Sequence, residues 1–314
     1  MRLRVTQLRL EADAVISVEL RSPTGERLPG WSAGAHVPVT LPSGTVRQYS
    51  LCGSADDPHS YTIAVLKVED GRGGSREVHD RLRLGDVLDV GEPRNDFALV
   101  DAPRYLLLAG GIGITPILAM VEELRSRPQP PEVTLLYGGR SRAAMAFTDR
   151  LAGFGGVYLH PQDEVGLPDL ERAFADSPAG TAVYCCGPPA MLSAVREIAV
   201  RYPDLPLHVE QFTAATPAST GAAEDGAFEV ELARTGVTVT VPADQSVLDA
   251  VLAVAPDTPF SCTSGFCGTC ETKVLSGQVD HRDDLLSDDE RRANASMMIC
   301  VSRARPGAKL TLDL

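Results

Sequence analysis

Four cysteines near the end of the chain have the spacing of an iron–sulfur ligand set. Cys262, Cys267 and Cys270 follow the pattern C-x4-C-x2-C, and Cys300 comes from a more distant segment. Plant-type [2Fe–2S] proteins use this spacing, and small residues in such a loop let backbone N–H groups turn toward sulfur. A zinc knuckle or a pair of disulfides is the alternative, but zinc sites usually show two C-x2-C units. The sequence therefore predicts a [2Fe–2S] cluster bound by these four cysteines.

A second candidate site lies on the segment Arg47-Gln-Tyr49-Ser50. On a β-strand Arg47 and Tyr49 point to the same face. A cation beside an aromatic ring suits a ligand that has a planar ring system and a phosphate. A solvated cross-strand pair is the alternative interpretation.

The segment Gly71-Arg-Gly-Gly-Ser75 precedes an expected helix that runs through Val78 and Leu82. Consecutive glycines let the backbone point N–H groups at an anion, and a helix N-terminus adds partial positive charge. Ser75 either caps this helix or binds the phosphate. A simple turn between a hairpin and a helix explains the same residues without a ligand.

A third candidate site begins where a continuous apolar run, residues 105–109, ends in Gly110-Gly-Ile-Gly-Ile-Thr115-Pro116. Such a run is typical of a buried parallel strand, and glycines after it let a pyrophosphate approach the backbone. We expect Thr115 to be the helix N-cap and Pro116 to lie in the first helical turn. The ordinary dinucleotide fingerprint is not met, because Pro116 takes the place of its third glycine.

Two further segments belong with this third site. Arg140 and Arg142 follow the next expected strand, and two guanidinium groups there suit a 2′-phosphate. Cys185 and Cys186 end a later strand, which breaks at Gly187-Pro188. We expect Cys185 to be a small buried apolar residue, whereas Cys186 is either buried in the same way or in contact with a cofactor.

The periodicity of the chain changes three times around these sites. Residues 1–98 read as short strands with one helix, which predicts a small antiparallel β-barrel. Residues 99–213 alternate strands and helices, as in an α/β domain with a parallel sheet. Residues 214–226 are small and polar and predict a linker, and residues 227–314 contain a hairpin, a helix and the cysteine loop.

Composition narrows the class of protein. The 314 residues carry a formal net charge of -13, which disfavours nucleic acid as a partner. The odd number of cysteines, seven, argues against a secreted disulfide framework. Without a signal peptide or a long apolar span, the sequence predicts a cytoplasmic protein that does not enter a membrane. None of the histidines lies in a catalytic pattern, and we expect no acid–base residue.

Together these motifs resemble the ferredoxin-reductase superfamily over essentially the whole chain. Arg47-Gln-Tyr-Ser with Gly71-Arg-Gly-Gly-Ser resembles its flavin half, Gly110 to Pro116 with Cys186-Gly-Pro resembles its nicotinamide half, and the last segment resembles a β-grasp plant-type ferredoxin. The resemblance is closest to the phthalate dioxygenase reductase branch, which includes vanillate O-demethylase reductase-like proteins. It therefore implies a multidomain chain: a flavin barrel, an α/β nucleotide domain and an α+β ferredoxin domain.

The resemblance also assigns residues to cofactors. It implies FMN bound by Arg47, Tyr49, Ser50, Val65, Lys67, Gly74, Ser75, Thr115 and Phe212. It implies NADH, in preference to NADPH, bound by Gly110, Gly111, Gly113, Thr115, Pro116, Arg140, Cys186, Gly187 and Pro188. For Phe212 a core aromatic is the alternative, and the segment 92–97 is expected to link two domains without touching a ligand.

The function implied is an electron relay from NADH through FMN and the cluster to a separate Rieske-type oxygenase that acts on an aromatic or similar small molecule. A cytochrome P450 partner is the nearest alternative. A free ferredoxin-like carrier and a stand-alone NAD(P)H-dependent flavin or quinone reductase are further ones. We expect a monomer. The acidic run 280–290 is read as a solvated face or as a surface that steers the domain to a basic partner.

Overall fold

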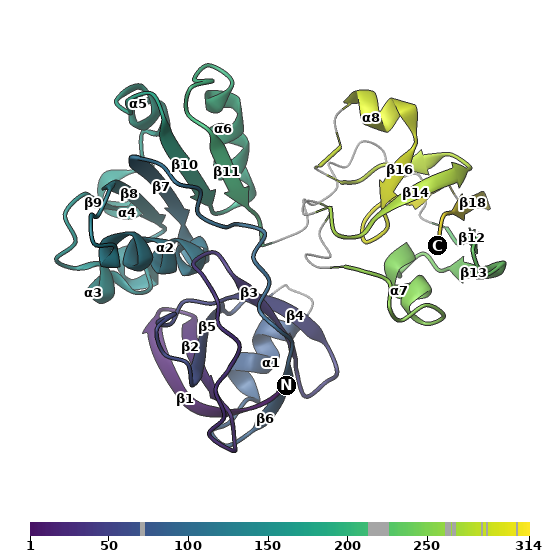
Figure 1. Ribbon diagram of the computed structural model, residues 1–314, viewed down its shortest axis with the longest axis horizontal. Helices are drawn as coiled ribbons and strands as arrows, with labels where there is room; N and C mark the ends of the chain where they lie inside the picture. Colours follow the sequence, from purple (N-terminus) through teal and green to yellow (C-terminus); the bar gives the residue numbers. More distant parts are fainter. Residues whose placement is uncertain are drawn as a thin grey trace. The chain divides into compact units, whose positions relative to one another are not determined.

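The structure is a computed structural model that describes residues 1–314 except 70–72, 213–225, 261–264, 266, 267, 284, 287 and 306. Most of the expected linker, the start of the Gly71–Ser75 segment, and Cys262 and Cys267 lie outside the described residues. The chain divides into two compact units, Met1–Gln211 and Phe212–Leu314. Figure 1 shows the elements of both units.

The first sheet of the chain is an antiparallel barrel. Its strands are β1 (Arg2–Ala12), β2 (Val15–Arg21), β3 (His36–Thr40), β4 (Val46–Ser50), β5 (Ser60–Leu66) and β6 (Val87–Val90), in the order β4-β3-β6-β1-β2-β5. Its two edges meet just after β4, where Leu51 pairs with Ile63 and the Cys52 N–H donates to the Thr62 carbonyl at 2.9 Å. Closing the sheet removes the exposed edges that would otherwise pair with other chains. The single helix α1 (Gly74–Asp80) lies between β5 and β6 in the chain.

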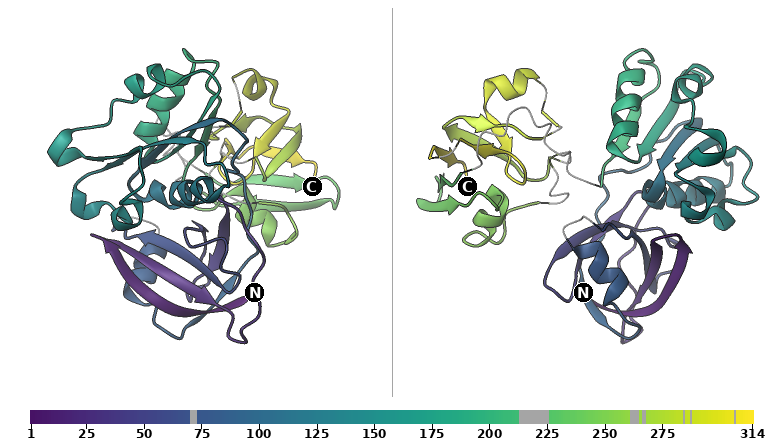
Figure 2. Two further views of the ribbon diagram at one scale, coloured as in Figure 1. Left: turned by 60° about the vertical axis from the view of Figure 1, so that its left-hand side comes forward. Right: turned by 180° about the vertical axis from the view of Figure 1, so that it is seen from behind.

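A five-stranded parallel sheet follows in the same unit. It is formed by β7 (Arg104–Gly110), β8 (Glu132–Gly139), β9 (Val157–Pro161), β10 (Thr181–Cys186) and β11 (Leu207–Glu210), in the order β11-β10-β7-β8-β9. Its helices are η1 (Gly111–Gly113), α2 (Ile114–Ser126), η2 (Arg142–Ala144), α3 (Thr148–Leu151), α4 (Gln162–Val165), α5 (Leu170–Ala175) and α6 (Pro189–Ala199). Figure 2 gives two further views of these elements.

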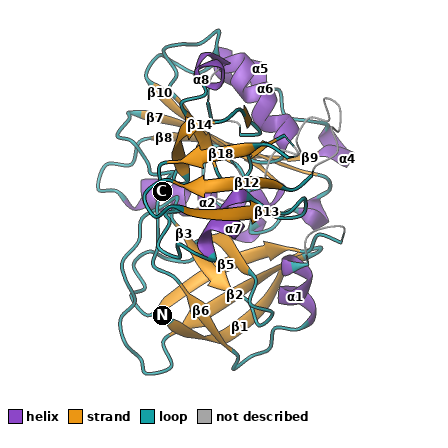
Figure 3. Cartoon of the chain, turned by 90° about the vertical axis from the view of Figure 1, so that its right-hand side faces the viewer, coloured by secondary structure: helices purple, strands orange, loops and turns teal. Residues whose placement is uncertain are grey.

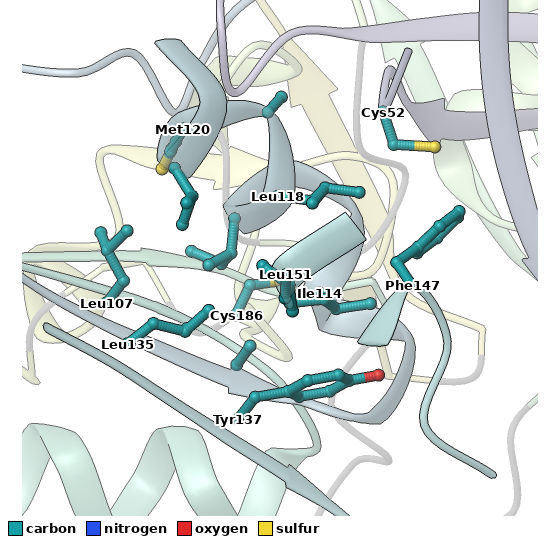
Figure 4. Packing of buried hydrophobic residues seen from close by; sticks show 14 of the residues in the cluster. Cys52, Leu107, Ile114, Leu118, Met120, Leu135, Tyr137, Phe147, Leu151 and Cys186 are labelled. Atoms are coloured by element: carbon teal, nitrogen blue, oxygen red, sulfur yellow. The ribbon is translucent and has the colours of Figure 1, made fainter. Parts of the chain in front are cut away.

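Both faces of this sheet are covered, which explains the apolar runs in its central strands. On one face Leu107 and Cys186 pack with Leu118 of α2, as Figure 4 shows. On the other face Cys185 packs with α6 and with Phe174 of α5. The expectation that Cys185 is a small buried core residue is therefore confirmed, since its side chain is 0% exposed.

The barrel has an apolar core of its own, and a second apolar cluster joins the barrel region to the parallel sheet within the first unit. Buried residues of the barrel region, among them Cys52 and Ala64, belong to the same apolar cluster as α2. Arg150 bridges the two parts: it donates to the Cys52 carbonyl at 2.8 Å and to both carboxylate oxygens of Glu122 at 2.7 Å. Paired guanidinium contacts of this kind restrict the geometry more than a point charge does.

The second unit has a mixed sheet. Its elements are β12 (Phe228–Leu232), β13 (Val237–Val241), α7 (Val247–Leu252), β14 (Glu271–Ser276), β15 (Val279–Asp280), α8 (Asp288–Ala293), β16 (Ser296–Met298), β17 (Arg303–Ala304) and β18 (Lys309–Leu312). The sheet order is β13-β12-β18-β14-β16, with β12 parallel to β18, and Figure 3 shows β12, β13, β14 and β18 side by side. The multidomain combination of an antiparallel barrel, a parallel α/β sheet and an α+β sheet confirms the predicted fold class.

The N-cap expected at Thr115 is wrong, and of the two alternatives for Ser75 the helix cap is excluded. The 3-10 turn Gly111–Gly113 runs directly into α2, so helical geometry begins before Thr115, and Gly113 is the N-cap. The Thr115 hydroxyl donates to the Ile112 carbonyl at 3.0 Å instead. Ser75 is likewise inside α1, whose N-cap is Gly73 in the left-handed conformation with φ 87°. Pro116 does lie in the first helical turn, as expected.

Candidate functional site

The two segments of the predicted flavin site, residues 47–50 and 71–75, meet in the structure at Arg47 and Gly74. Arg47 on β4 lies across Gly74 at the start of α1, because a Cβ added at position 74 would lie 2.9 Å from Arg47 Nε and 3.2 Å from Arg47 Cγ. Gly74 is buried, and the preceding Gly73 has the positive φ that glycine adopts without strain. The fold therefore places a guanidinium group beside a glycine-rich turn, the arrangement that a phosphate requires.

The other predicted flavin ligands differ in what their side chains do. Tyr49 is half-buried, and burial raises its pKa to about 12, so its ring is a neutral platform. Val65 points into the barrel core at 3% exposure, which leaves only its backbone for a ligand. Lys67 is paired through Nζ with Asp80 at 2.9 Å and with Glu69 at 3.7 Å. The Ser75 hydroxyl accepts a hydrogen bond from the Val68 N–H at 3.1 Å.

The glycines of the third site are required by close packing between two turns. A Cβ at Gly113 would lie 2.2 Å from the Cys186 carbonyl oxygen, and a Cβ at Gly110 would lie 2.5 Å from Pro188 Cδ. A Cβ at Gly187 would in turn lie 3.2 Å from Gly110 Cα. Gly111 differs, because its φ is +55° and an added Cβ would meet nothing within 4 Å. It is therefore the position where the backbone faces open space.

These two turns lie at the switch point of the parallel sheet. From β7 the chain moves outward to β8 and β9, and it then returns to the opposite side of β7 through β10 and β11. The turns after β7 and β10 therefore flank the crevice in which open α/β sheets bind ligands. Six of the predicted nucleotide ligands lie in or next to these turns: Gly110, Gly111, Gly113, Thr115, Gly187 and Pro188.

Thr115 and Cys186 are both inside the core at this edge. Thr115 is 2% exposed and Cys186 is 0% exposed, so contact with a cofactor would have to use the backbone or a small movement. Burial also raises the pKa of the Cys186 thiol well above its usual value, so this thiol is not a reactive thiolate. Their roles in binding stay predictions.

The two arginines after β8 are not equivalent. Arg142 forms an ion pair with Glu164, with Nη2 and Oε2 2.8 Å apart, and that pairing raises the pKa of the guanidinium and lowers the pKa of the carboxyl. Arg140 is exposed. The structure thus keeps Arg142 engaged with the Glu164 carboxylate, and the predicted role of the two arginines at a nucleotide stays a prediction.

Glu210 is a functional candidate that the sequence reasoning missed. It ends β11, pairs in register with Cys186 of β10, and is 8% exposed. Its pKa is raised to about 8, mainly by burial and also by the nearby charge of Asp96, while the nearby Ser50 hydroxyl lowers it in part. Among the described residues, Oε2 of Glu210 has no hydrogen-bond partner. The one available signal was an acidic residue at the end of a strand in a buried sheet.

The iron–sulfur site is described in part. Cys270 and Cys300 are 3% and 7% exposed and share one apolar core, and the Ile299 N–H next to Cys300 donates to the Cys270 carbonyl at 3.5 Å. Gly265 and Gly268 have φ of +79° and +78°, so the loop uses backbone geometry that favours glycine. The described cysteines therefore fit a cluster, while Cys262 and Cys267 lie outside the described residues.

Phe212 follows the buried Gln211 and is the first residue of the second unit. Its side chain is 41% exposed, so it is not a core aromatic in the described structure. Its predicted place near the flavin stays a prediction.

Comparison with known proteins assigns the family. Residues 230–305 match the 2Fe-2S iron-sulfur cluster binding domain, and residues 107–160 match the oxidoreductase NAD-binding domain. The solved structure of a phthalate dioxygenase reductase, described as modular for electron transfer from pyridine nucleotides to [2Fe-2S], has a TM-score of 0.83 and 38% identity over 100% of this chain and 98% of that chain. This chain belongs to the phthalate dioxygenase reductase family.

Other members and a larger protein share the same arrangement. The phenoxybenzoate dioxygenase subunit beta of Ectopseudomonas oleovorans is 42% identical over 99% of this chain and 97% of its own length. An intact type IV self-sufficient cytochrome P450 monooxygenase matches 100% of this chain with 44% identity and a TM-score of 0.78, and this chain spans 41% of that protein. The phthalate dioxygenase reductase family therefore accounts for the full length of the chain. No helix in the described part is long and apolar enough to cross a membrane.

Proposed function

We propose that this chain is the reductase component of a multicomponent oxygenase, which passes electrons from NADH through FMN to a [2Fe-2S] cluster and on to a separate terminal oxygenase. The observation that carries the proposal is the presence, in one chain, of the Arg47–Gly74 turn, the switch-point glycines and the buried cysteine pair. FMN can exchange electrons singly or in pairs, whereas nicotinamide carries two and the cluster one.

The residues of the chain would divide the binding work. Arg47, with the Gly74–Ser75 turn, would hold the flavin phosphate, while Tyr49 and Ser50 on the same strand would line the flavin ring. Lys67, which directly follows β5, would also lie near the flavin, although its ammonium group is already paired with Asp80. The buried Ser50 hydroxyl lies near the Glu210 carboxyl but forms no hydrogen bond of good geometry with a described residue, so a bound flavin would give it a partner.

The nucleotide site favours NADH over NADPH. Glu164 engages Arg142, and the neighbouring Asp163 adds a second negative charge near that guanidinium. A 2′-phosphate would have to displace a carboxylate to reach Arg142, whereas a ribose diol carries no charge to repel. Arg140 would then remain at the edge of the adenosine site.

We propose a Rieske-type oxygenase as the electron acceptor, in a cytoplasmic system in which this reductase is a monomer. The substrate of that oxygenase would be an aromatic or similar small molecule. The names of several relatives support this proposal, since they include reductase subunits of dioxygenase and monooxygenase systems. A P450 acceptor is a second candidate, because the chain matches part of a self-sufficient P450 at 44% identity. The proposed domains are 1–98 for FMN, 99–213 for NADH, 214–226 as linker and 227–314 for the cluster.

Rapid mixing of the purified holoprotein with NADH tests this function. Flavin absorbance should bleach first, and the reduced cluster should then appear as an electron paramagnetic resonance signal. Reduction of the flavin with a cluster that stays oxidised would contradict the relay. Adding a purified Rieske oxygenase or a P450 as acceptor then distinguishes the two partner classes.

A further inference from the structure

Asp283 is a buried carboxylate in the middle of the acidic run 280–290. It is 3% exposed, whereas Asp280 and Glu290 of the same run are exposed. The interpretation of the run as a solvated face is therefore wrong for Asp283. A buried carboxylate costs desolvation free energy unless its surroundings compensate, so its contacts are informative.

Asp283 touches both segments that carry cluster cysteines. Toward Cys300, its Oδ1 lies 3.2 Å from the Ser302 hydroxyl, which also accepts the Arg282 N–H at 3.2 Å. Toward the loop between Cys262 and Cys270, its Cα would lie 3.1 Å from a Cβ added at Gly265. Its other carboxylate oxygen accepts the Leu286 N–H at 2.9 Å. The Asp283 carboxylate thus bonds to the fourth-cysteine segment at Ser302, while the backbone of Asp283 packs against the cysteine loop at Gly265.

Two basic groups face this carboxylate. Nη2 of Arg291 donates to the Asp283 carbonyl oxygen and lies 3.9 Å from Oδ2. Nδ1 of His281 lies 3.6 Å from Oδ1, and the His281 side chain is 7% exposed. Arg291 compensates part of the negative charge of Asp283. Because the carboxylate is buried, solvent screens this charge little, and it acts more strongly on nearby groups than an exposed charge would.

We propose that Asp283 is a positioning residue for the iron–sulfur site, which ties the two cysteine segments together and holds the reduction potential of the bound cluster low. The inference rests on the [2Fe-2S] assignment of the proposed function. Reduction adds one negative charge to the cluster, so a fixed neighbouring negative charge disfavours it, and charge and hydrogen bonding are established determinants of cluster potential. Arg291 acts in the opposite direction by compensating that charge.

The test is a redox titration of the full-length holoprotein, monitored by the electron paramagnetic resonance signal of the reduced cluster. Asp283→Asn keeps the shape of the side chain and removes its charge. We expect the cluster to become about tenfold easier to reduce, a positive shift of about 59 mV for a one-electron couple, while the flavin potential stays unchanged. Asp280→Asn removes an exposed charge from the same run and should leave the potential unchanged.

Arg291→Gln provides an independent variant with the opposite sign. At pH 8.5 it should shift the cluster potential to a more negative value, and Arg292→Gln, on the exposed side of the same helix, should not. An unchanged potential in Asp283→Asn with full iron content would overturn the proposal. If Asp283→Asn loses its iron, the cluster potential of Arg291→Gln is the test. A more negative potential in this variant supports the proposal, and an unchanged potential overturns it. Absence of any cluster in the unmodified protein would instead reject the proposed function.

Discussion

Arg47 and Gly74 come from separate elements and lie against each other, so that no side chain fits at position 74 without moving the guanidinium group. This contact unites two short motifs that are ambiguous when each is considered alone. An arginine on a strand is often solvated, and a glycine turn before a helix is common. Their convergence is the specific feature that supports a phosphate site.

Gly74→Ala is expected to weaken FMN binding. The added Cβ would push Arg47 out of its position, and we expect a loss of affinity of at least about tenfold, equivalent to about 1.4 kcal/mol. The measurement is FMN release followed by flavin fluorescence. Gly30→Ala is the matched control in the barrel, because nothing lies within 4 Å of an added Cβ there. If both variants bind FMN with equal affinity, the position of Arg47 beside Gly74 does not contribute to binding the FMN phosphate.

Glu164→Gln is expected to increase the use of NADPH. Without its carboxylate partner, Arg142 becomes available to a 2′-phosphate, and we expect kcat/KM for NADPH to rise about tenfold. The value for NADH should change little. Steady-state kinetics with both nucleotides measure this change. The control is Asp176→Asn, which breaks the exposed ion pair between Arg172 and Asp176 at the end of α5. If NADPH use stays low, the Arg142–Glu164 pair has no part in selectivity.

Glu210 should make the folded protein less stable as the pH rises. Its pKa is raised to about 8 in the folded protein, so the folded state holds this proton more tightly than the unfolded chain does. The resulting contribution to stability is fully present below the ordinary carboxyl pKa of about 4.5 and is lost as the pH rises through about 8. We expect a loss of about 2–4 kcal/mol across this range.

Denaturant unfolding at a series of pH values, with Glu210→Gln beside the unmodified chain, measures this contribution. The variant carries no titrating group at this position, so the difference in unfolding free energy between the two proteins should change with pH. A constant difference from pH 4.5 to pH 9 would show that Glu210 is ionised in the folded state throughout.

Cys300→Ser is expected to abolish the cluster and to leave FMN in place. A serine hydroxyl is a much weaker iron ligand than a thiolate, and Cys300 belongs to the second unit, whereas Arg47 and Gly74 of the proposed phosphate site belong to the first. Iron, acid-labile sulfide and flavin analysis of the purified variant give the result. Cys185→Ala removes a buried thiol of the first unit and should keep full iron content. Normal iron in Cys300→Ser would contradict the ligand assignment.

The sequence alone determined the features that depend on local spacing. The cysteine pattern, the glycine-rich turn after the first parallel strand and the burial of Cys185 follow from residue type and neighbours along the chain, because chain geometry limits what such segments can form. The change in periodicity also indicated the fold class correctly: an antiparallel barrel, a parallel α/β sheet and an α+β sheet. Local reasoning failed at the N-cap expected for Thr115, where the preceding 3-10 turn had already started the helix.

Only the tertiary structure decided which charged groups are buried and which are paired. Asp283 and Glu210 look like ordinary acidic residues in the sequence, yet both are buried, and Arg142 is paired with the carboxylate of Glu164 in α4. These properties depend on groups that come from distant segments of the chain. Desolvation and charge pairing act through space, so they become visible only when the fold brings those segments together.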